Sequence, residues 1–284
     1  MKPRRDAETC PIEHWDRTAA RFTSGAGDAP VQWRSWGTGR PVLLLHGGGG
    51  SWTHWIRNLE VLRRRFQVIA PDLPGFGDSP LPPGLASAED MAAVMRSALS
   101  QALPPSGPFD IVGFSFGGII AGLIAAGEGT RVGTVVLVGP GGLGLDLRPA
   151  ATVQRVGPDA TPEEVRAADR HNLAGLLIAD PDEIDDLALC VFRRNVERTR
   201  FNLGGIPATD VLARALPAVT ANVVVVYGEH DQFARGDLDP REQVLRAARP
   251  GLRFEVVEGA GHWVPFEAAE VFNSRIFDWL SPAS

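Results

Sequence analysis

The sequence predicts a fold of the α/β class, and three observations support this prediction. Short runs of β-branched and other apolar residues recur along the chain, each bounded by Gly, Pro or Asp. Longer amphipathic segments of helical length separate these runs. The most continuous runs contain few polar residues, which is typical of central parallel strands that are buried on both faces. Strands that alternate with helices in this way predict a mostly parallel sheet covered by helices on both sides.

We expect six strands, at residues 41–45, 66–70, 109–112, 132–138, 223–227 and 252–257. Helices between or after them are expected at residues 86–103, 116–126, 241–248 and 268–280. Between residues 141 and 217 only helical patterns occur, such as 162–171 and 182–200. We therefore expect a helical cap at 141–217, inserted into a core formed by 31–140 and 218–284. The polar, partly Gly-rich residues 1–30 are expected to form a loose lead-in.

Composition narrows the function classes. The chain has 284 residues, of which 44% are apolar, so it can bury a large core and is not disordered. With 28 Lys and Arg against 34 Asp and Glu, the formal net charge is −6, which argues against nucleic acid as a partner. No apolar run reaches the ~18 residues of a membrane span, and no apolar stretch follows the basic N-terminus as in a signal peptide. We expect a cytoplasmic protein that acts on a small molecule, without a membrane partner; a homo-oligomer remains open.

Metal and disulfide chemistry is not expected. Cys10 and Cys190 are too few for a disulfide framework or a zinc cluster. The six histidines show no zinc-ligand spacing. Residues 139–144 fit the pattern Gly-x-Gly-x-x-Gly, but no clear helix follows them, so we do not expect a bound dinucleotide. The prediction is a protein with no metal and no cofactor.

Residues 113–117, Gly-Phe-Ser-Phe-Gly, carry the strongest chemical signal in the sequence. They follow a predicted strand directly and open a predicted apolar helix. In the Gly-x-Ser-x-Gly pattern a serine lies on a strained strand-to-helix turn, and the small flanking residues allow the chain to pass closely. This context predicts that Ser115 is a nucleophile.

A serine nucleophile needs a base, and the base needs an acid that orients it. His262 lies in a Gly-rich turn after the last predicted strand, at the carboxyl edge of the sheet, and is our candidate base. The loop after the strand at 223–227 supplies the acid. Asp231 is the first choice, with Glu229 and Asp237 as alternatives.

An oxyanion site is expected where glycines follow the first of these strands. His46 and four glycines come directly after residues 41–45, and glycine allows backbone N–H groups to face a ligand without a nearby Cβ. We assign the oxyanion donors to the N–H of Gly48, or Gly49 as its substitute, and to the N–H of Phe116, next to the nucleophile. His46 is expected to be structural.

These motifs together resemble the α/β-hydrolase superfamily from about Trp33 to Leu280. The chain order Ser115, Asp231, His262 is the order found in that fold, and residues 71–79 resemble its loop after the third strand. A serine at the elbow argues against epoxide hydrolases and haloalkane dehalogenases. The resemblance implies an α/β-hydrolase fold with an inserted cap.

Finer features resemble the meta-cleavage-product hydrolases, which break carbon–carbon bonds in ring-opened aromatic compounds. These features are residues 46–49, 139–144 and the stretch 261–273. The resemblance implies a substrate site near His54, where that family usually has Asn, and near Arg193 or Arg194, the nearest counterparts of its cap arginine. Phe114, which stands where the family has Asn, and Trp263 are the candidate aromatic walls.

We therefore expect a serine hydrolase that acts on a small, partly apolar carbonyl compound. The bond cleaved is either a carboxylic ester or lactone, or a meta-cleavage-type carbon–carbon bond. Two other uses of the fold stay open at this point: a slow-turnover ligand receptor or accessory protein, and a cofactor-free perhydrolase.

Overall fold

The computed structural model describes residues 11–25, 27–104, 106–147, 152–234 and 237–281. A single eight-stranded sheet runs through these residues in the order β1-β2-β4-β3-β5-β6-β7-β8. Its strands are β1 (Ala20–Ser24), β2 (Val31–Trp36), β3 (Arg40–Leu45), β4 (Phe66–Asp72), β5 (Phe109–Phe114), β6 (Val132–Val138), β7 (Asn222–Gly228) and β8 (Arg253–Val257). The pairs from β4 to β8 are parallel, whereas β1–β2 and β2–β4 are antiparallel. The prediction of a mostly parallel α/β fold is confirmed.

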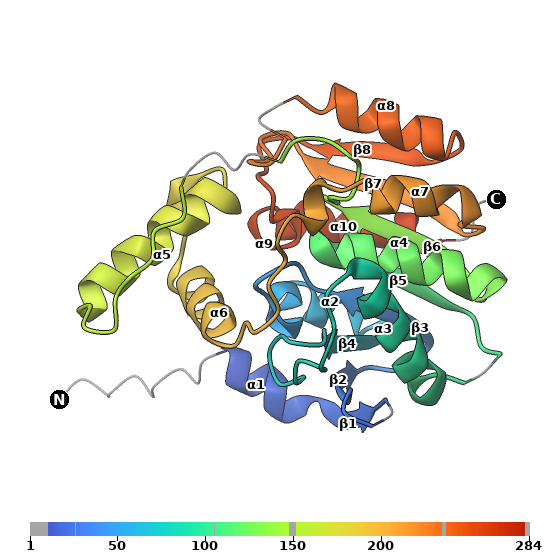
Figure 1. The fold of residues 1–284 in the computed structure, drawn as a ribbon, viewed down its shortest axis with the longest axis horizontal. Coiled ribbons are helices and arrows are strands. Elements are labelled where there is room, and N and C mark those ends of the chain that lie inside the picture. The colour runs from blue at the N-terminus through green and yellow to red at the C-terminus, as the bar shows by residue number, and fades with distance from the viewer. Residues whose placement is uncertain (1–10, 26, 105, 148–151, 235–236, 282–284) are drawn as a thin grey trace.

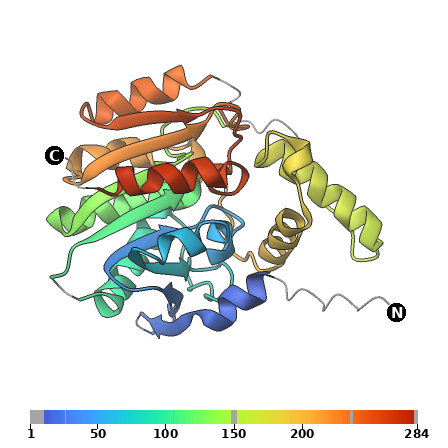
Figure 2. The same cartoon turned by 180° about the vertical axis from the view of Figure 1, so that it is seen from behind.

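Helices cover both faces of this sheet. The α-helices are α1 (Pro11–Thr18), α2 (Leu59–Leu62), α3 (Ala88–Ala102), α4 (Phe116–Glu128), α5 (Pro162–Leu176), α6 (Asp186–Glu197), α7 (Val211–Ala215), α8 (Asp239–Ala248), α9 (Val264–Glu267) and α10 (Ala269–Trp279). Figure 1 shows α3, α4, α7 and α8 in front of the sheet, and Figure 2 shows α2 and α10 on the opposite face. In the described part of the chain no helix has the length and apolarity needed to cross a bilayer.

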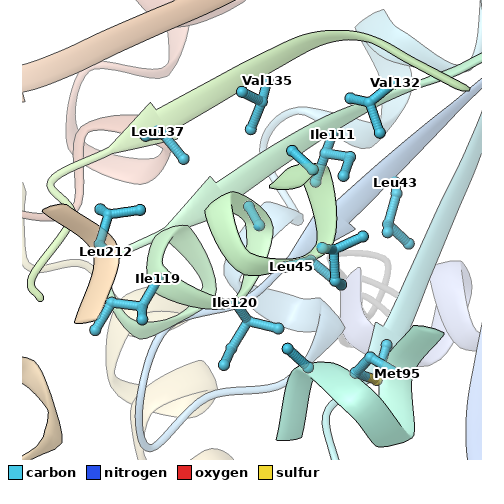
Figure 3. Packing of buried hydrophobic residues seen from close by; sticks show 14 of the residues in the cluster. Leu43, Leu45, Met95, Ile111, Ile119, Ile120, Val132, Val135, Leu137 and Leu212 are labelled. Carbon is cyan, nitrogen blue, oxygen red and sulfur yellow. The ribbon is translucent and has the colours of Figure 1, made fainter. Parts of the chain in front are cut away.

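The strands divide the core into two layers because side chains alternate along a strand. In β3, Leu43 and Leu45 belong to the layer under α3 and α4, and Val42 and Leu44 to the layer on the other face. Figure 3 shows Leu45 and its neighbours from β5 and β6 packed around α4. Burying an aliphatic side chain stabilises the fold by about 1.5–3 kcal/mol. The continuous apolar runs thus hold the central strands between the two helical layers.

The expectation of a loose lead-in is wrong for residues 11–24. This segment forms α1 and the edge strand β1, which pairs with β2. The ring of Phe22 stacks on that of Trp33 at 5.9 Å, and Ile12 is buried. Polar residues hide such an edge strand in the sequence because much of it faces solvent. Residues 1–10 of the predicted lead-in lie outside the described residues.

Between β6 and β7 the described residues form helices and turns but no strand. Helices α5 and α6 stand to one side of the sheet, clear of both helical layers (Figure 1, yellow). Helix α7 lies instead on the core, where a Cβ added to Gly122 of α4 would be 2.2 Å from Leu212 Cδ1. Residues 211–215 therefore pack with the sheet domain, although the sequence placed them in the inserted lobe.

Candidate active site

Ser115 occupies the turn between β5 and α4 in a strained backbone conformation. With φ of 54° and ψ of −115°, it is the one non-glycine residue with positive φ in the described part of the chain. Such a conformation costs about 1–3 kcal/mol and persists only where the surroundings enforce it. Here the N–H of Ser115 donates to Val138 O at 2.7 Å, and its carbonyl accepts from Gly118 N–H at 2.9 Å. Its flanking residues are buried, whereas Ser115 is partly exposed.

The glycines on either side of this serine are sterically required. A Cβ at Gly113 would lie 2.3 Å from Gly117 O, and a Cβ at Gly117 would lie 2.3 Å from Leu45 O. Both distances are far below van der Waals contact, so no larger residue fits without moving β3 or α4. The elbow predicted from the five-residue pattern is therefore present in the backbone.

His262 and Asp231 form a buried hydrogen-bonded pair. His262 Nδ1 lies 2.7 Å from Asp231 Oδ2, and both side chains are almost wholly buried. The other oxygen, Oδ1, accepts the N–H groups of Phe233 at 2.8 Å and Ala234 at 3.1 Å. Burial alone would raise the pKa of Asp231, but the charge and hydrogen bond of His262 and the N–H of Phe233 lower it overall. An ionised Asp231 can only accept, so Nδ1 of His262 carries the proton.

The second ring nitrogen of His262 is buried and has no hydrogen-bond partner among the described residues. Buried polar atoms without partners are rare. Because Nδ1 is already bonded to Asp231, Nε2 is the ring nitrogen that can accept a proton. The ring lies near the elbow: its centroid is 5.0 Å from that of Phe114. A Cβ added to Gly139, which follows the residue that binds Ser115 N–H, would be 3.0 Å from His262 Cε1. The structure thus brings His262 and Asp231 together beside the Ser115 turn.

Of the three acids left open by the sequence, Asp231 is the one in contact with His262. Glu229 is 47% exposed and accepts the N–H of Gly259 instead. Asp237 is exposed. Loop geometry after β7, which sequence patterns do not encode, decides between them.

The candidate oxyanion donors stand on two neighbouring segments. Phe116 is the first residue of α4, and its N–H has no acceptor among the described residues. In the loop after β3, Gly47 N–H donates to His54 Nδ1 at 3.2 Å, whereas Gly48 and Gly49 N–H have no acceptor among the described residues. The N–H groups of Gly48 and Gly49 are therefore the ones left for a ligand. Leu203 from the insertion covers Gly48, since an added Cβ would lie 2.3 Å from Leu203 Cδ1.

Two buried histidines support this loop. His46 Nδ1 donates to Gly47 O at 2.8 Å, and its Nε2 accepts Leu73 N–H at 2.9 Å, as expected for a structural residue. Burial, with a smaller effect from His46 and His262, brings the pKa of His54 well below its ordinary value. A neutral His54 that accepts at Nδ1 carries its proton on Nε2. That donor has no partner in the described part of the chain, which makes His54 a candidate ligand-binding group.

The other predicted substrate-binding residues differ in their surroundings. Phe114 and Trp263 are buried, and their rings lie 5.5 and 4.9 Å from that of His54. Arg193 makes a two-pronged bond to Asp169, with Nε and Nη2 at 2.8 and 2.5 Å. Arg194 on α6 is half-buried and has no partner among the described residues.

Residues that the sequence analysis did not select complete the surroundings. Phe233 packs edge-on against His262 with ring centroids 4.6 Å apart, and Phe201 stacks on Phe116 at 5.9 Å. Gln232 accepts the backbone N–H of His262 at 2.8 Å. Only its position next to Asp231 could have drawn attention to Gln232. The shell around the elbow and the histidine is mostly aromatic.

Within the described residues this cluster holds no metal site, and a surface cavity lies apart from it. Among the described residues no group of three or more His, Cys, Asp or Glu side chains could hold a metal ion. A cavity of about 410 Å³ lies against α5 and α6, where Asp169, Asp186 and Arg193 contribute to its lining. Ser115, Asp231 and His262 take no part in it, so the cavity is separate from the candidate active site.

Residues 42–275 match the model of the alpha/beta hydrolase family. The chain belongs to this family. The resemblance to this superfamily and the prediction of a hydrolase are thus confirmed. A 2-hydroxy-6-oxo-6-phenylhexa-2,4-dienoate hydrolase from Burkholderia cepacia is 27% identical over 94% of this chain and 98% of its own length.

Solved structures show the same fold. A meta-cleavage product hydrolase from Pseudomonas fluorescens IP01 superposes with a TM-score of 0.71 at 22% identity, covering 91% of this chain and 96% of that one. A thermophilic esterase from Thermogutta terrifontis superposes with a TM-score of 0.66 at 26% identity, over 92% and 97% of the two chains. The names of these two proteins differ, one being a meta-cleavage product hydrolase and the other an esterase.

Proposed function

We propose that this protein is a serine hydrolase that cleaves a carboxylic ester or lactone of a small, partly apolar acid. The observation that carries the proposal is the buried Asp231–His262 pair, whose Nε2 has no partner among the described residues and whose ring packs against Phe114, next to the strained Ser115. A serine hydroxyl becomes nucleophilic when an oriented base removes its proton. The aromatic shell favours a substrate with an apolar acyl or alcohol part.

The proposed reaction has two steps. Ser115 Oγ bonds to the carbonyl carbon while its proton passes to His262 Nε2, and Asp231 stays ionised and stabilises the imidazolium. The N–H groups of Gly48 (or Gly49) and Phe116 hold the oxyanion. His262 then gives its proton to the leaving alkoxide as the carbon–oxygen bond breaks. Water, deprotonated by His262, releases the acid and restores Ser115.

A second candidate is the hydrolysis of a carbon–carbon bond next to a ketone, and the named activity of the Burkholderia cepacia relative favours it. A carbon leaving group must be stabilised by conjugation, and such dienoate substrates also carry a carboxylate. A carboxylate in the site needs a cation that is not already neutralised. Arg193 is already paired with Asp169, so Arg194 is the arginine of α6 that could bind a substrate carboxylate.

The first test uses a fluorophosphonate, which bonds to an activated serine with loss of fluoride. Intact-protein mass spectrometry should find one adduct on the wild-type protein and none on Ser115→Ala. Ser274→Ala, which removes an exposed serine of α10, is the matched control and should label like wild type. A folded wild-type protein without an adduct would overturn the proposal and favour a ligand receptor.

A substrate panel then separates the two bond types. Turnover of p-nitrophenyl butyrate but not of 2-hydroxy-6-oxo-6-phenylhexa-2,4-dienoate supports the ester hydrolase. Faster turnover of the dienoate supports the second candidate. In either case Ser115→Ala should abolish the activity.

A further inference from the structure

The loop that carries His262 rests on the inserted segment rather than on the sheet alone. The N–H of Trp263, the next residue, donates to Leu177 O at 2.8 Å. A Cβ added to Gly261, the preceding residue, would lie 2.6 Å from Ala179 N. The backbone on both sides of the candidate base therefore touches the segment that follows α5.

One carboxylate joins these two pieces of backbone. Glu267, the last residue of α9, accepts Ala179 N–H at 2.8 Å and Asp180 N–H at 2.9 Å with Oε1. Its other oxygen, Oε2, accepts Gly261 N–H at 2.7 Å. Hydrogen bonds to a charged acceptor are roughly twice as strong as neutral ones. Glu267 thus ties the residue before His262 to the insertion through three such bonds.

A second side chain spans the same gap from the acid loop. Gln232, which follows Asp231, accepts His262 N–H at 2.8 Å with Oε1, and its Nε2 donates to Ala174 O at 3.4 Å. The loops after β7 and β8 are therefore bonded both to each other and to the end of α5. The insertion therefore contacts the His262 loop, and it also contacts the candidate oxyanion loop through Leu203.

We infer that Glu267 is a positioning residue, which fixes the His262 loop against residues 177–180 so that the ring keeps its place between Asp231 and Ser115. Its two oxygens already accept three N–H groups, so it has a structural rather than a chemical part in the reaction. The inference rests on the proposed serine hydrolase. A misplacement of about 1 Å in such a site lowers turnover by about 10²-fold, so Glu267 controls rate through geometry.

Glu267→Gln tests this inference, because the amide keeps the shape of the side chain but replaces one acceptor oxygen with an NH₂ group. Glu270→Gln is the matched control: Glu270 is exposed, lies in the first turn of the next helix and makes no side-chain hydrogen bond within the described residues. We expect Glu267→Gln to lower both the fluorophosphonate labelling rate and kcat for p-nitrophenyl acetate by about 10²-fold, with KM changed by less than about twofold. The control should retain wild-type values.

A second readout separates positioning from a loss of folded protein. The proton between His262 Nδ1 and Asp231 should give a low-field ¹H NMR signal in wild type, and this signal should broaden or vanish in Glu267→Gln while the thermal transition stays cooperative. Glu267→Asp, whose shorter chain cannot span both sides, should behave in the same way and replaces the Gln variant if that variant does not fold. Wild-type labelling rates and an unchanged signal in a folded variant would overturn the inference. If wild type itself takes no adduct, it is the proposed function that fails.

Discussion

Two buried aspartates at opposite edges of the sheet differ in what burial does to them. Asp231 follows the carboxyl end of β7, and Asp110 is the second residue of β5, near the amino edge. Both are within a few per cent of complete burial. At Asp231 both oxygens are occupied, one by the ring of His262 and one by two backbone N–H groups, and the pKa lies below its ordinary value.

Asp110 has donors on one oxygen only. Its Oδ1 accepts Arg40 Nη2 at 2.5 Å and Thr134 N–H at 2.8 Å, whereas Oδ2 is buried without a partner among the described residues. Burial raises the pKa of Asp110 to about 6, although Arg40 and the N–H of Thr134 oppose the rise. Near pH 6 this carboxyl is only half ionised.

The comparison shows that the charges and donors around a buried carboxyl, together with its burial, decide whether its pKa falls, as at Asp231 beside His262, or rises, as at Asp110. The proposed hydrolase needs an ionised carboxylate next to its base, and among the described residues Asp231 is the carboxylate in contact with His262. Parallel α/β sheets place their functional groups at the carboxyl edge, where loops provide backbone donors. The amino edge of this sheet instead carries a carboxyl whose charge is not stabilised on both oxygens.

The largest effect should come from Asp231→Asn, which removes the fixed charge. The amide cannot stabilise the imidazolium and favours the wrong tautomer of His262, so kcat for p-nitrophenyl butyrate should fall by about 10⁴-fold. Stopped-time assays at high enzyme concentration measure this. Asp237→Asn, in the same loop, is the control and should stay within about twofold of wild type. Near-normal turnover in Asp231→Asn would mean that the charge of Asp231 is not needed for the reaction.

The sequence indicates the parallel part of this fold well, because short β-branched runs such as 132–138, bounded by turn residues, are typical of strands in the middle of a sheet. The sequence does not indicate β1, because its mostly exposed residues include no apolar run. Ser115 and His262 could be selected because a glycine pattern marks their turns. The sequence also favoured Asp231 over Glu229, but the contact of Asp231 with His262 depends on the path of the loop after β7.

Contacts between distant segments lay beyond the sequence altogether. Nothing in the pattern around Glu267 indicates that it accepts N–H groups about 88 positions earlier in the chain. Likewise, no pattern says that His54 takes up Gly47 N–H and leaves the next two glycines for a ligand. Such bonds depend on how loops and the insertion fold back onto the core, which local periodicity does not encode.

A smaller effect should appear in the pH dependence of stability. Because the pKa of folded Asp110 is about 6, above that of an unfolded Asp, the folded state holds its proton longer as pH rises. The contribution of this group to the free energy of unfolding should therefore fall by about 2 kcal/mol between pH 4 and pH 6, and level off above about pH 7. Urea unfolding of wild type and Asp110→Asn at pH 4, 5, 6 and 7 measures this fall. The fall should be absent from the pH profile of Asp110→Asn.

The same series with Asp78→Asn provides the control of opposite sign. Burial raises the pKa of Asp78, but Arg34 and other arginines lower it overall, so its stabilisation is present at neutral pH and lost on acidification. Asp78→Asn should thus be less stable than wild type at pH 7, and the difference between the two proteins should become smaller at low pH. Identical profiles for Asp110→Asn and wild type would mean that the raised pKa of Asp110 is not a property of the folded protein.

The smallest effect should follow from Arg40→Met, which removes the cation beside Asp110 but keeps an unbranched apolar chain. Without that charge the pKa of Asp110 rises further, so the variant should lose about 1 kcal/mol at pH 8, where Asp110 is ionised. At pH 4 Asp110 is protonated in the folded state, and the two proteins should unfold at nearly the same urea concentration. Arg64→Met, which breaks an exposed pair with Glu60, controls for the loss of a surface charge. An equal loss at both pH values would assign the role of Arg40 to packing rather than charge and would leave Asp110 governed by burial alone.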